Sequence, residues 1–236
     1  MPYICRLIRN KLLFTALAAL ALLAALPLST RADEISLFNF NDSNLVVDRG
    51  NGTLTTTVAP TNVVLTFGGT TVNAQMGDPA GNALTLQNGT NGANNGANLT
   101  LNTSTVGFNL ITVSFATQRT STGFNSNQFQ YSTNSGATFT NFGSPFTPAA
   151  SFALQSFDLS SITALNNNAL AAFRIVFNGG DSTSSAGNNR IDNLLVAGTP
   201  FAPVAAVPEP TSMILLGTGL AGIAASFRRR RRNFSR

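Results

Sequence analysis

The chain has 236 residues, a formal net charge of +5 and one cysteine, with no histidine and no tryptophan. Its positive charge is concentrated at the two ends, because the segment 33–206 contains eight acidic residues, four arginines and no lysine, for a net charge of −4. This segment offers no basic surface to a phosphate backbone, so we expect no nucleic acid partner.

The first 32 residues show the three-part layout of a secretory signal peptide. Basic residues precede the Leu/Ala-rich run 12–28, and Thr30 and Ala32 place small or short side chains just before the expected cleavage point. We predict cleavage by signal peptidase after Ala32 and export of the chain that follows. An uncleaved N-terminal anchor helix is the alternative, although the apolar run is shorter than the roughly 20 residues that a spanning helix prefers.

The segment 33–199 is predicted to be one β-sandwich domain without disulfides, because Cys5 leaves with the signal peptide. Apolar residues alternate with Thr, Ser, Asn and Gln in short runs, which turn-forming pairs such as Asn-Gly and Gly-Gly separate. We predict an all-β fold, a two-sheet antiparallel sandwich with at most one helical turn, within 162–172. The predicted strands are 35–40, 53–58, 62–67, 83–86, 98–101, 107–117, 127–133, 137–142, 151–158, 170–178 and 191–198.

Phenylalanine supplies most of the aromatic content, with 18 Phe against two Tyr. We expect the phenylalanines to fill the space between the two sheets. Surfaces that stack on sugars usually present exposed Trp or Tyr, and Tyr131 is the single tyrosine of the domain. The core phenylalanines are predicted to be Phe38, Phe40, Phe115, Phe129, Phe157, Phe173 and Phe177.

The asparagine-rich stretch 88–98 contains no large apolar anchor. We expect a mobile surface loop there, because nothing in its composition offsets the entropy of ordering it.

The composition of the domain excludes several classes of catalysis. Without His, Cys or Lys it has no Ser-His or Cys-His nucleophile, no Schiff base and no zinc site of His or Cys. Glu34 is its single glutamate, and the aspartates are scattered singly in turns. We therefore predict that the protein is not an enzyme. A carboxylate-dependent hydrolase is the alternative, and it would require two aspartates facing each other in a cleft.

Asp192 is the acidic residue with the most unusual predicted position. Strand alternation places its carboxylate on one face with Leu194 and Val196, where it needs a partner. One interpretation is a salt bridge or hydrogen bonds to turn amides. The other is a structural Ca²⁺ that takes oxygens from Asp192 and from Asp42 or its neighbours.

The segment 207–236 follows a short linker, 200–206, and has three parts. A motif of two prolines around a glutamate holds the backbone extended. The apolar run 212–227 is predicted to be a transmembrane helix, and a block of arginines then stops translocation. The motif residues are Val207, Pro208, Glu209 and Pro210, and the stop-transfer residues are Arg228, Arg229, Arg230, Arg231 and Arg232.

This order of motif, apolar run and arginines resembles the PEP-CTERM sorting signal of Gram-negative envelope bacteria. The resemblance covers 207–236 only, and it indicates where the protein is delivered rather than which activity it has. It implies an exosortase that recognises the motif and cleaves near it, after a transient stage in which the precursor is tethered to the inner membrane. The mature protein would then lie at the cell surface or in the extracellular matrix.

The domain also resembles the jelly-roll sandwiches of exported PEP-CTERM proteins, in the segments 38–42, 130–132 and 190–193. This resemblance implies that the first and last strands pair and share a Ca²⁺ site, which places Asp42 and Asp192 close together. The aromatic platform of the related carbohydrate-binding modules is not evident. We therefore expect a non-catalytic envelope or matrix protein associated with exopolysaccharide, with a carbohydrate-binding module as the alternative.

Overall fold

The computed structural model describes residues 32–181, 183 and 186–201. The chain divides into two compact units, 1–200 and 201–236, and the described fold lies almost entirely in the first. The predicted signal helix, the sorting motif and the stop-transfer arginines lie outside the described residues. Ala32 is described, and it is exposed directly before the first strand. Within the described ranges, no helix has both the length and the apolar character needed to cross a membrane.

The described chain consists of strands joined by turns and three single turns of 3₁₀ helix. Eleven of the strands overlap the predicted ones, and the very short β2 was not predicted. The 3₁₀ turns are η1 (Pro60–Asn62), η2 (Thr90–Gly92) and η3 (Thr163–Leu165), the last of them inside the segment predicted to hold one helical turn. The strands are β1 (Asp33–Phe38), β2 (Arg49–Gly50), β3 (Thr53–Thr56), β4 (Val63–Gly68), β5 (Asn82–Gln87), β6 (Asn98–Thr103), β7 (Phe108–Arg119), β8 (Ser126–Ser132), β9 (Thr140–Asn141), β10 (Ala153–Asp158), β11 (Ala171–Asn178) and β12 (Asn188–Pro200).

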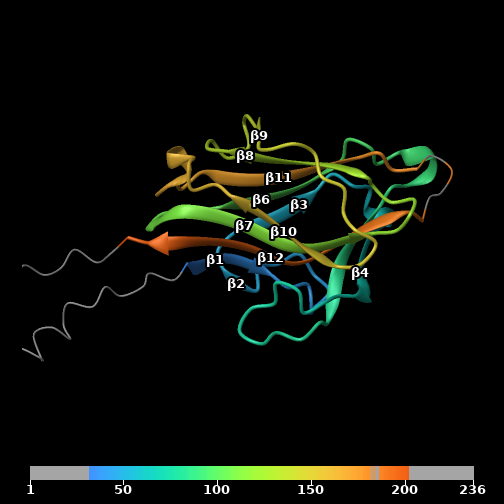
Figure 1. Cartoon of the computed structure of the whole chain (residues 1–236), viewed down its shortest axis with the longest axis horizontal. Helices are drawn as coiled ribbons and strands as arrows, with labels where there is room; N and C mark the ends of the chain where they lie inside the picture. Colours follow the sequence, from blue (N-terminus) through green and yellow to red (C-terminus); the bar gives the residue numbers. More distant parts are fainter. Residues whose placement is uncertain (1–31, 182, 184–185, 202–236) are drawn as a thin grey trace, which may run out of the picture. The chain divides into compact units, whose positions relative to one another are not determined.

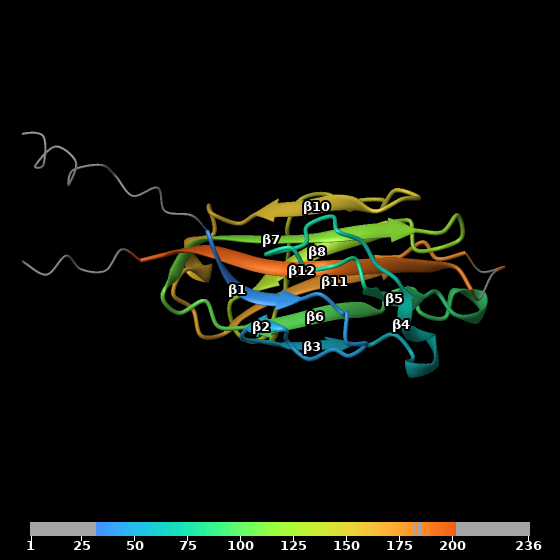
Figure 2. The ribbon, with the colours of Figure 1, turned by 90° about the horizontal axis from the view of Figure 1, so that it is seen from below.

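The strands form two antiparallel sheets that pack face to face (Figure 1). Sheet A has seven strands in the order β10-β7-β12-β1-β2, with β5 also paired to β12 and β4 to β5. Sheet B has five strands in the order β3-β6-β11-β8-β9. Figure 2 shows β10, β7, β12 and β1 of sheet A side by side. Most successive strands alternate between the sheets, which is jelly-roll connectivity, so the prediction of an all-β two-sheet antiparallel sandwich is confirmed.

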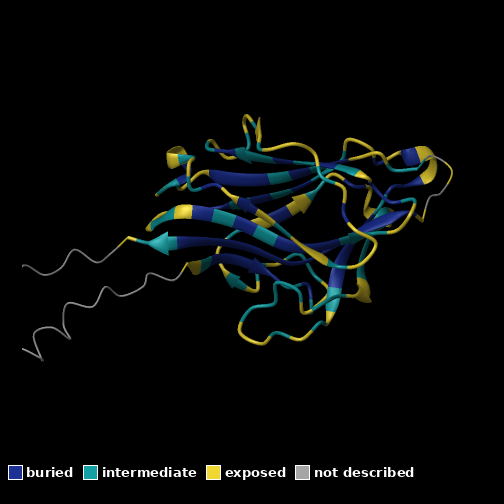
Figure 3. Ribbon diagram, in the orientation of Figure 1, coloured by how far each residue is buried: buried dark blue, intermediate teal, exposed yellow. Residues whose placement is uncertain are grey.

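The core lies between the sheets, where one face of most strands is buried (Figure 3). All seven phenylalanines predicted for the core are buried. The rings of Phe129 and Phe157 stack at a centroid distance of 3.9 Å and an angle of 7°. The ring of Phe173 is nearly parallel to that of Phe129, at a centroid distance of 6.4 Å. Aromatic pairs of this kind add stabilisation beyond their buried area.

The first and last strands are neighbours, as expected from the resemblance to jelly rolls. In the ladder between β1 and β12, Leu37 pairs with Leu195 and Phe38 with Leu194. Leu37, Leu195 and Ala197 are buried on the side of sheet A that faces away from the main core, where they form a small cluster of their own. The long loop 69–81 is bonded to this outer side of sheet A and crosses it in Figure 2.

The structure contradicts the expectation of an unanchored loop over 88–98. Asn88 is 0% exposed, and its Nδ2 donates hydrogen bonds to the carbonyls of Thr122 and Asp181 at 3.0 and 2.8 Å. Asn94 donates to the carbonyl of Gln87, and the amide of Gly96 donates to the carbonyl of Phe177. Side-chain amides therefore supply the anchoring that we had expected only from apolar residues.

Candidate functional site

Asp192 is completely buried in the last strand, beside a break in the regular ladder. The pairing of β12 with β7 shifts between Asp192 and Leu195, and Asn193 adopts a left-handed backbone with φ of 50°. The Oδ2 atom of Asp192 accepts a hydrogen bond from the amide of Thr70 at 2.7 Å, and Oδ1 accepts one from the amide of Asn193 at 2.8 Å. The interpretation that Asp192 binds backbone amides is therefore confirmed.

Burial is the dominant electrostatic effect on Asp192. It raises the pKa of this carboxyl to about 7, although the hydrogen bonds from the amides of Thr70 and Asn193 lower it. Two neutral amides do not balance the charge of a buried carboxylate, so the group favours either a proton or a nearby cation.

Two carbonyl oxygens lie next to the carboxylate of Asp192, around Gly69. A Cβ on residue 69 would lie 2.3 Å from Oδ2 of Asp192, 2.4 Å from the carbonyl oxygen of Ala80 and 2.6 Å from that of Asn82. Only glycine fits at this position, because one oxygen from β12 and two from the segment 80–82 pack closely around it. Carboxylate and carbonyl oxygens are the ligands that Ca²⁺ prefers, so these atoms have the donor chemistry of the predicted metal site. The point that they surround lies one bond length from the Cα of Gly69, so an ion would have to contact these oxygens from another side. A bound Ca²⁺ would neutralise Asp192.

Asp42 lies in an exposed turn after β1, and its Oδ2 accepts a hydrogen bond from Asn44 at 2.5 Å. Its neighbours Asn41 and Ser43 both contact the segment next to Gly69. The Oδ1 atom of Asn41 accepts from the amide of Asn82 at 3.0 Å, and its Nδ2 donates to the carbonyl of Pro79 at 3.2 Å. Among the described residues, no three His, Cys, Asp or Glu side chains lie together in a group that could hold a metal ion. A shared ion between Asp42 and Asp192 stays a prediction.

Sequence reasoning missed the carbonyls of Ala80 and Asn82. The signal for them is Asp78-Pro79-Ala80-Gly81, a turn-forming stretch between two predicted strands, but its position over β12 depends on tertiary packing.

Two of the carboxylates considered for catalysis are bound to an arginine. Arg49 Nε contacts Glu34 at 2.8 Å, and Arg49 Nη2 contacts Asp78 at 3.0 Å. The hydrogen bond that Arg49 donates to Glu34 raises the pKa of Arg49 above its usual value. Burial lowers this pKa by less, and the hydrogen bond to Asp78 raises it further. These acids therefore join β1, β2 and the loop 69–81 as a structural ion cluster.

The outer face of sheet B presents a continuous row of polar side chains that crosses all of its strands. The register aligns residues from β3, β6, β11, β8 and β9 side by side. The sequences of these five strands contain no Asp or Glu. The row consists of Thr55, Thr100, Arg174, Gln130 and Asn141.

Arg174, at the centre of this polar row, is held from two sides. Its Nε donates a hydrogen bond to Oε1 of Gln130 at 2.7 Å. Its guanidinium carbon lies 3.7 Å from the ring centroid of Phe139, in the loop between β8 and β9. Partial burial lowers the pKa of Arg174 from its usual value. The guanidinium nevertheless stays fully charged at neutral pH. The sequence shows the residues of this row but not the register that aligns them.

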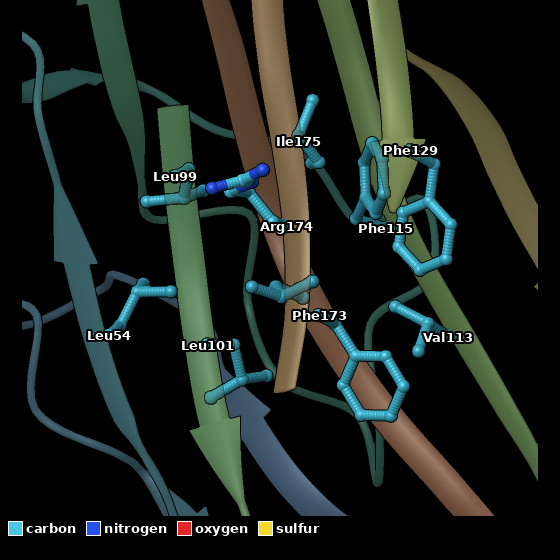
Figure 4. A pocket seen from close by; sticks show the side chains of 10 residues that line it. Leu54, Leu99, Leu101, Val113, Phe115, Phe129, Phe173, Arg174 and Ile175 are labelled. Atoms are coloured by element: carbon cyan, nitrogen blue, oxygen red, sulfur yellow. The ribbon is translucent and has the colours of Figure 1, made fainter. Parts of the chain in front are cut away.

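A small cavity lies between the sheets (Figure 4). Apolar side chains from both sheets line it, including Leu54, Leu101, Val113 and Phe173. Its volume of about 10 Å³ is near that of a single water position. The cavity is therefore a packing gap in the core rather than a ligand site.

Residues 206–231 match the PEP-CTERM protein-sorting motif. The chain thus carries this motif at the place where the sequence predicted it. The match covers only this short C-terminal segment. No curated protein matches the chain significantly.

Several solved structures resemble the domain in shape. The CBM22-1 xylan-binding domain of Paenibacillus barcinonensis Xyn10C has 8% identity and a TM-score of 0.42, and the match covers 74% of this chain and 100% of that domain. The N-terminal cellulose-binding domain of Cellulomonas fimi β-1,4-glucanase C has 12% identity and a TM-score of 0.38, covering 65% of this chain and 97% of that one. Likenesses at this level carry no inference about a ligand.

Proposed function

We propose that this chain is an exported, non-catalytic protein of the cell envelope or extracellular matrix, which an exosortase sorts and which associates with exopolysaccharide. The observation that carries the proposal is the PEP-CTERM sorting motif at 206–231. The basic residues before the first apolar run and after the second favour a precursor with both ends in the cytoplasm and the domain outside. Signal peptidase removes 1–32, and the exosortase acts near Val207–Pro210.

The C-terminal run 212–227 suits a temporary tether better than a permanent anchor. It is shorter than the roughly 20 residues that span the hydrocarbon core, and it contains Gly217, Gly219 and Gly222, which lower helix propensity. Cleavage after delivery would release the domain from the inner membrane of a Gram-negative type of envelope.

The proposal is tested by replacing Pro208, Glu209 and Pro210 with alanine in a host that has the sorting enzyme. The altered precursor is expected to remain longer and membrane-bound, whereas the unaltered chain is shortened. A matched control replaces Phe201, Pro203 and Val204, in the linker, with alanine. An identical mature mass for the motif variant and the unaltered chain would overturn exosortase sorting. A periplasm-active reporter fused after Phe201 should be active, and activity only of a cytoplasmic reporter would overturn the export route.

A carbohydrate-binding module is the second candidate function, and the polar row on sheet B favours it. Hydroxyl and amide side chains on adjacent strands offer donors and acceptors to sugar hydroxyls. A glycan array on the purified domain, with and without Ca²⁺, tests this candidate. Binding of no glycan under either condition would count against it and against association with exopolysaccharide.

A further inference from the structure

We infer that Arg174 is the anion-contacting residue of a surface for acidic polysaccharide on the outer face of sheet B. The inference rests on the proposed association with polysaccharide and adds the chemical class of the ligand and the residue that selects it.

Arg174 differs from the other arginines of the described domain in having a free guanidinium end. Arg49 is bound by Glu34 and Asp78. Arg119 donates through Nη1 to the carbonyls of Thr120 and Ser121, and Arg190 donates through Nη1 to the carbonyl of Gly68.

The hydrogen bond of Arg174 to described residues uses Nε, which leaves Nη1 and Nη2 without a partner there. Neither of these nitrogens is among the buried side-chain atoms that lack a hydrogen bond. The two amino groups of Arg174 therefore face solvent.

The free end is already oriented for an anion. Stacking on Phe139 and the bond to Gln130 fix the plane of the guanidinium. A guanidinium that is already held in place loses little conformational entropy when it binds an anion. Its two parallel N–H groups match the two oxygens of a carboxylate or the oxygens of a sulfate. The usual side-on approach through Nε is taken by Gln130, so the geometry points to end-on contact through Nη1 and Nη2.

The anion must come from outside this face of the molecule. The strands of sheet B contain no Asp or Glu, so no acid on them can neutralise Arg174. A partly buried cation without a counter-ion keeps an unfavourable desolvation cost that an incoming anion offsets. The domain as a whole is acidic, so general electrostatic attraction does not bring anions to it and a specific contact is required.

The neighbours of Arg174 identify the anion as part of a polysaccharide. Thr100 lies beside it on one strand and Gln130 on the other, and Gln130 Nε2 donates to Oδ1 of Asn141 at 2.7 Å. Five strands spaced about 4.8 Å apart make a row of roughly 19 Å, which has room for several sugar units. Apart from Arg174, the side chains of the row carry hydroxyl and amide groups. Such a surface suits hydroxyl-rich chains that contain uronate or sulfate groups.

The test uses the segment 33–201, because both sheets and the core lie within it and because it omits the C-terminal arginines, which bind acidic polymers by themselves. Its affinity for polygalacturonate and alginate is measured by titration calorimetry, with dextran as the neutral polymer. Arg174→Gln should weaken binding of the acidic polymers at least tenfold. Arg174→Lys should restore only a small part, because an ammonium lacks the planar fork.

Arg119→Gln is the matched control, because it removes the same charge from another place in the domain. It should change the affinity less than twofold, and the melting temperature of each variant shows that the fold is retained. An equal loss for Arg119→Gln, or no loss for Arg174→Gln, would overturn the inference. Binding of dextran alone would overturn the acidic specificity but leave the association with polysaccharide standing. Binding of no polymer would overturn both, and processing of the sorting motif would be unaffected by either result.

Discussion

The amide of Thr70 donates to Oδ2 of Asp192 at 2.7 Å, although 122 positions separate the two residues in the chain. The next residue of the last strand continues this connection, because Asn193 Nδ2 donates to the carbonyls of Thr70 and Val72 at 2.8 and 2.9 Å. In return, Asn73 donates to the carbonyl of Asn193 at 2.8 Å. Two adjacent residues of β12 thus fix the loop 69–81 on the outer side of sheet A.

Replacement of Gly69 by alanine should destabilise the domain by about 2 to 3 kcal/mol, the upper part of the usual range for an overpacked site. The added methyl would lie within 2.6 Å of three oxygens, two of them on the backbone. Gly68→Ala is the matched control, because a Cβ there meets nothing within 4 Å, and its effect should stay below about 1 kcal/mol. Chemical denaturation of both variants measures the difference, and equal stabilities would show that the site around Gly69 is not tightly packed.

The predicted calcium site implies that a chelator lowers the melting temperature of the domain. Ca²⁺ at a hundred times its dissociation constant would add about 2.7 kcal/mol of stability, which is roughly 5 to 10 °C for a domain of this size. Asp192→Ala should abolish the difference between Ca²⁺ and chelator. Asp158→Ala should preserve it, because Asp158 is exposed and its Oδ1 accepts from the amide of Ser160.

Asp42→Ala decides which oxygens take part in that site. Loss of the calcium response in this variant would support the pair predicted from the sequence. A normal response, together with loss in Asp192→Ala, would favour the carbonyls of Ala80 and Asn82 instead. A melting temperature that is the same with Ca²⁺ and with chelator in the unaltered protein would exclude a stabilising calcium ion.

Without calcium, Asp192 should make the domain less stable as the pH rises from about 4 to about 7. Burial raises the pKa of this carboxyl from 3.8 to about 7 in the folded state, so the folded protein holds a proton that the unfolded chain has released. The free energy of unfolding then falls over this interval, by up to about 4 kcal/mol at 1.36 kcal/mol per unit of pKa.

Asp192→Asn isolates this contribution of Asp192, because the asparagine side chain does not titrate. Urea denaturation at several pH values in chelator should show the fall in the unaltered protein and a flatter profile in the variant. The same slope in both proteins would mean that another group causes the pH dependence.

The strands could be predicted well from the sequence, because each strand shows an alternation of apolar and polar residues within its own few residues. The burial of Phe129 and Phe157 follows from that alternation. The alignment of Arg174 with Gln130 and Thr100 depends on strand order and register, which no local pattern specifies. The same is true of the hydrogen bond from Thr70 to Asp192, because that contact joins a loop to the last strand.

The error over 88–98 has a different physical origin. The prediction rested on apolar content, whereas this loop is held by hydrogen bonds that buried side-chain amides donate to backbone carbonyls. Composition records how many asparagines are present, but it does not record whether carbonyls lie within their reach. Asn88 meets two such carbonyls, which come from the loops after β7 and β11.

Asn88→Ala should therefore destabilise the domain by about 1 to 3 kcal/mol, the cost of leaving buried hydrogen-bonding groups without partners. The change removes the hydrogen bonds that Asn88 donates to the carbonyls of Thr122 and Asp181, in a position that is 0% exposed. The carbonyl of Thr122 keeps a second bond, from the amide of Asp181. Thr90→Ala in the same loop is the control, because Thr90 is exposed and its change should cost less than about 0.5 kcal/mol. Urea denaturation gives the stabilities, and amide hydrogen exchange should show faster opening at Asn94 and Gly96 in the Asn88 variant alone. If both variants are equally stable, the loop does not depend on this buried amide. That result would support the expectation of a mobile loop, which was drawn from the composition.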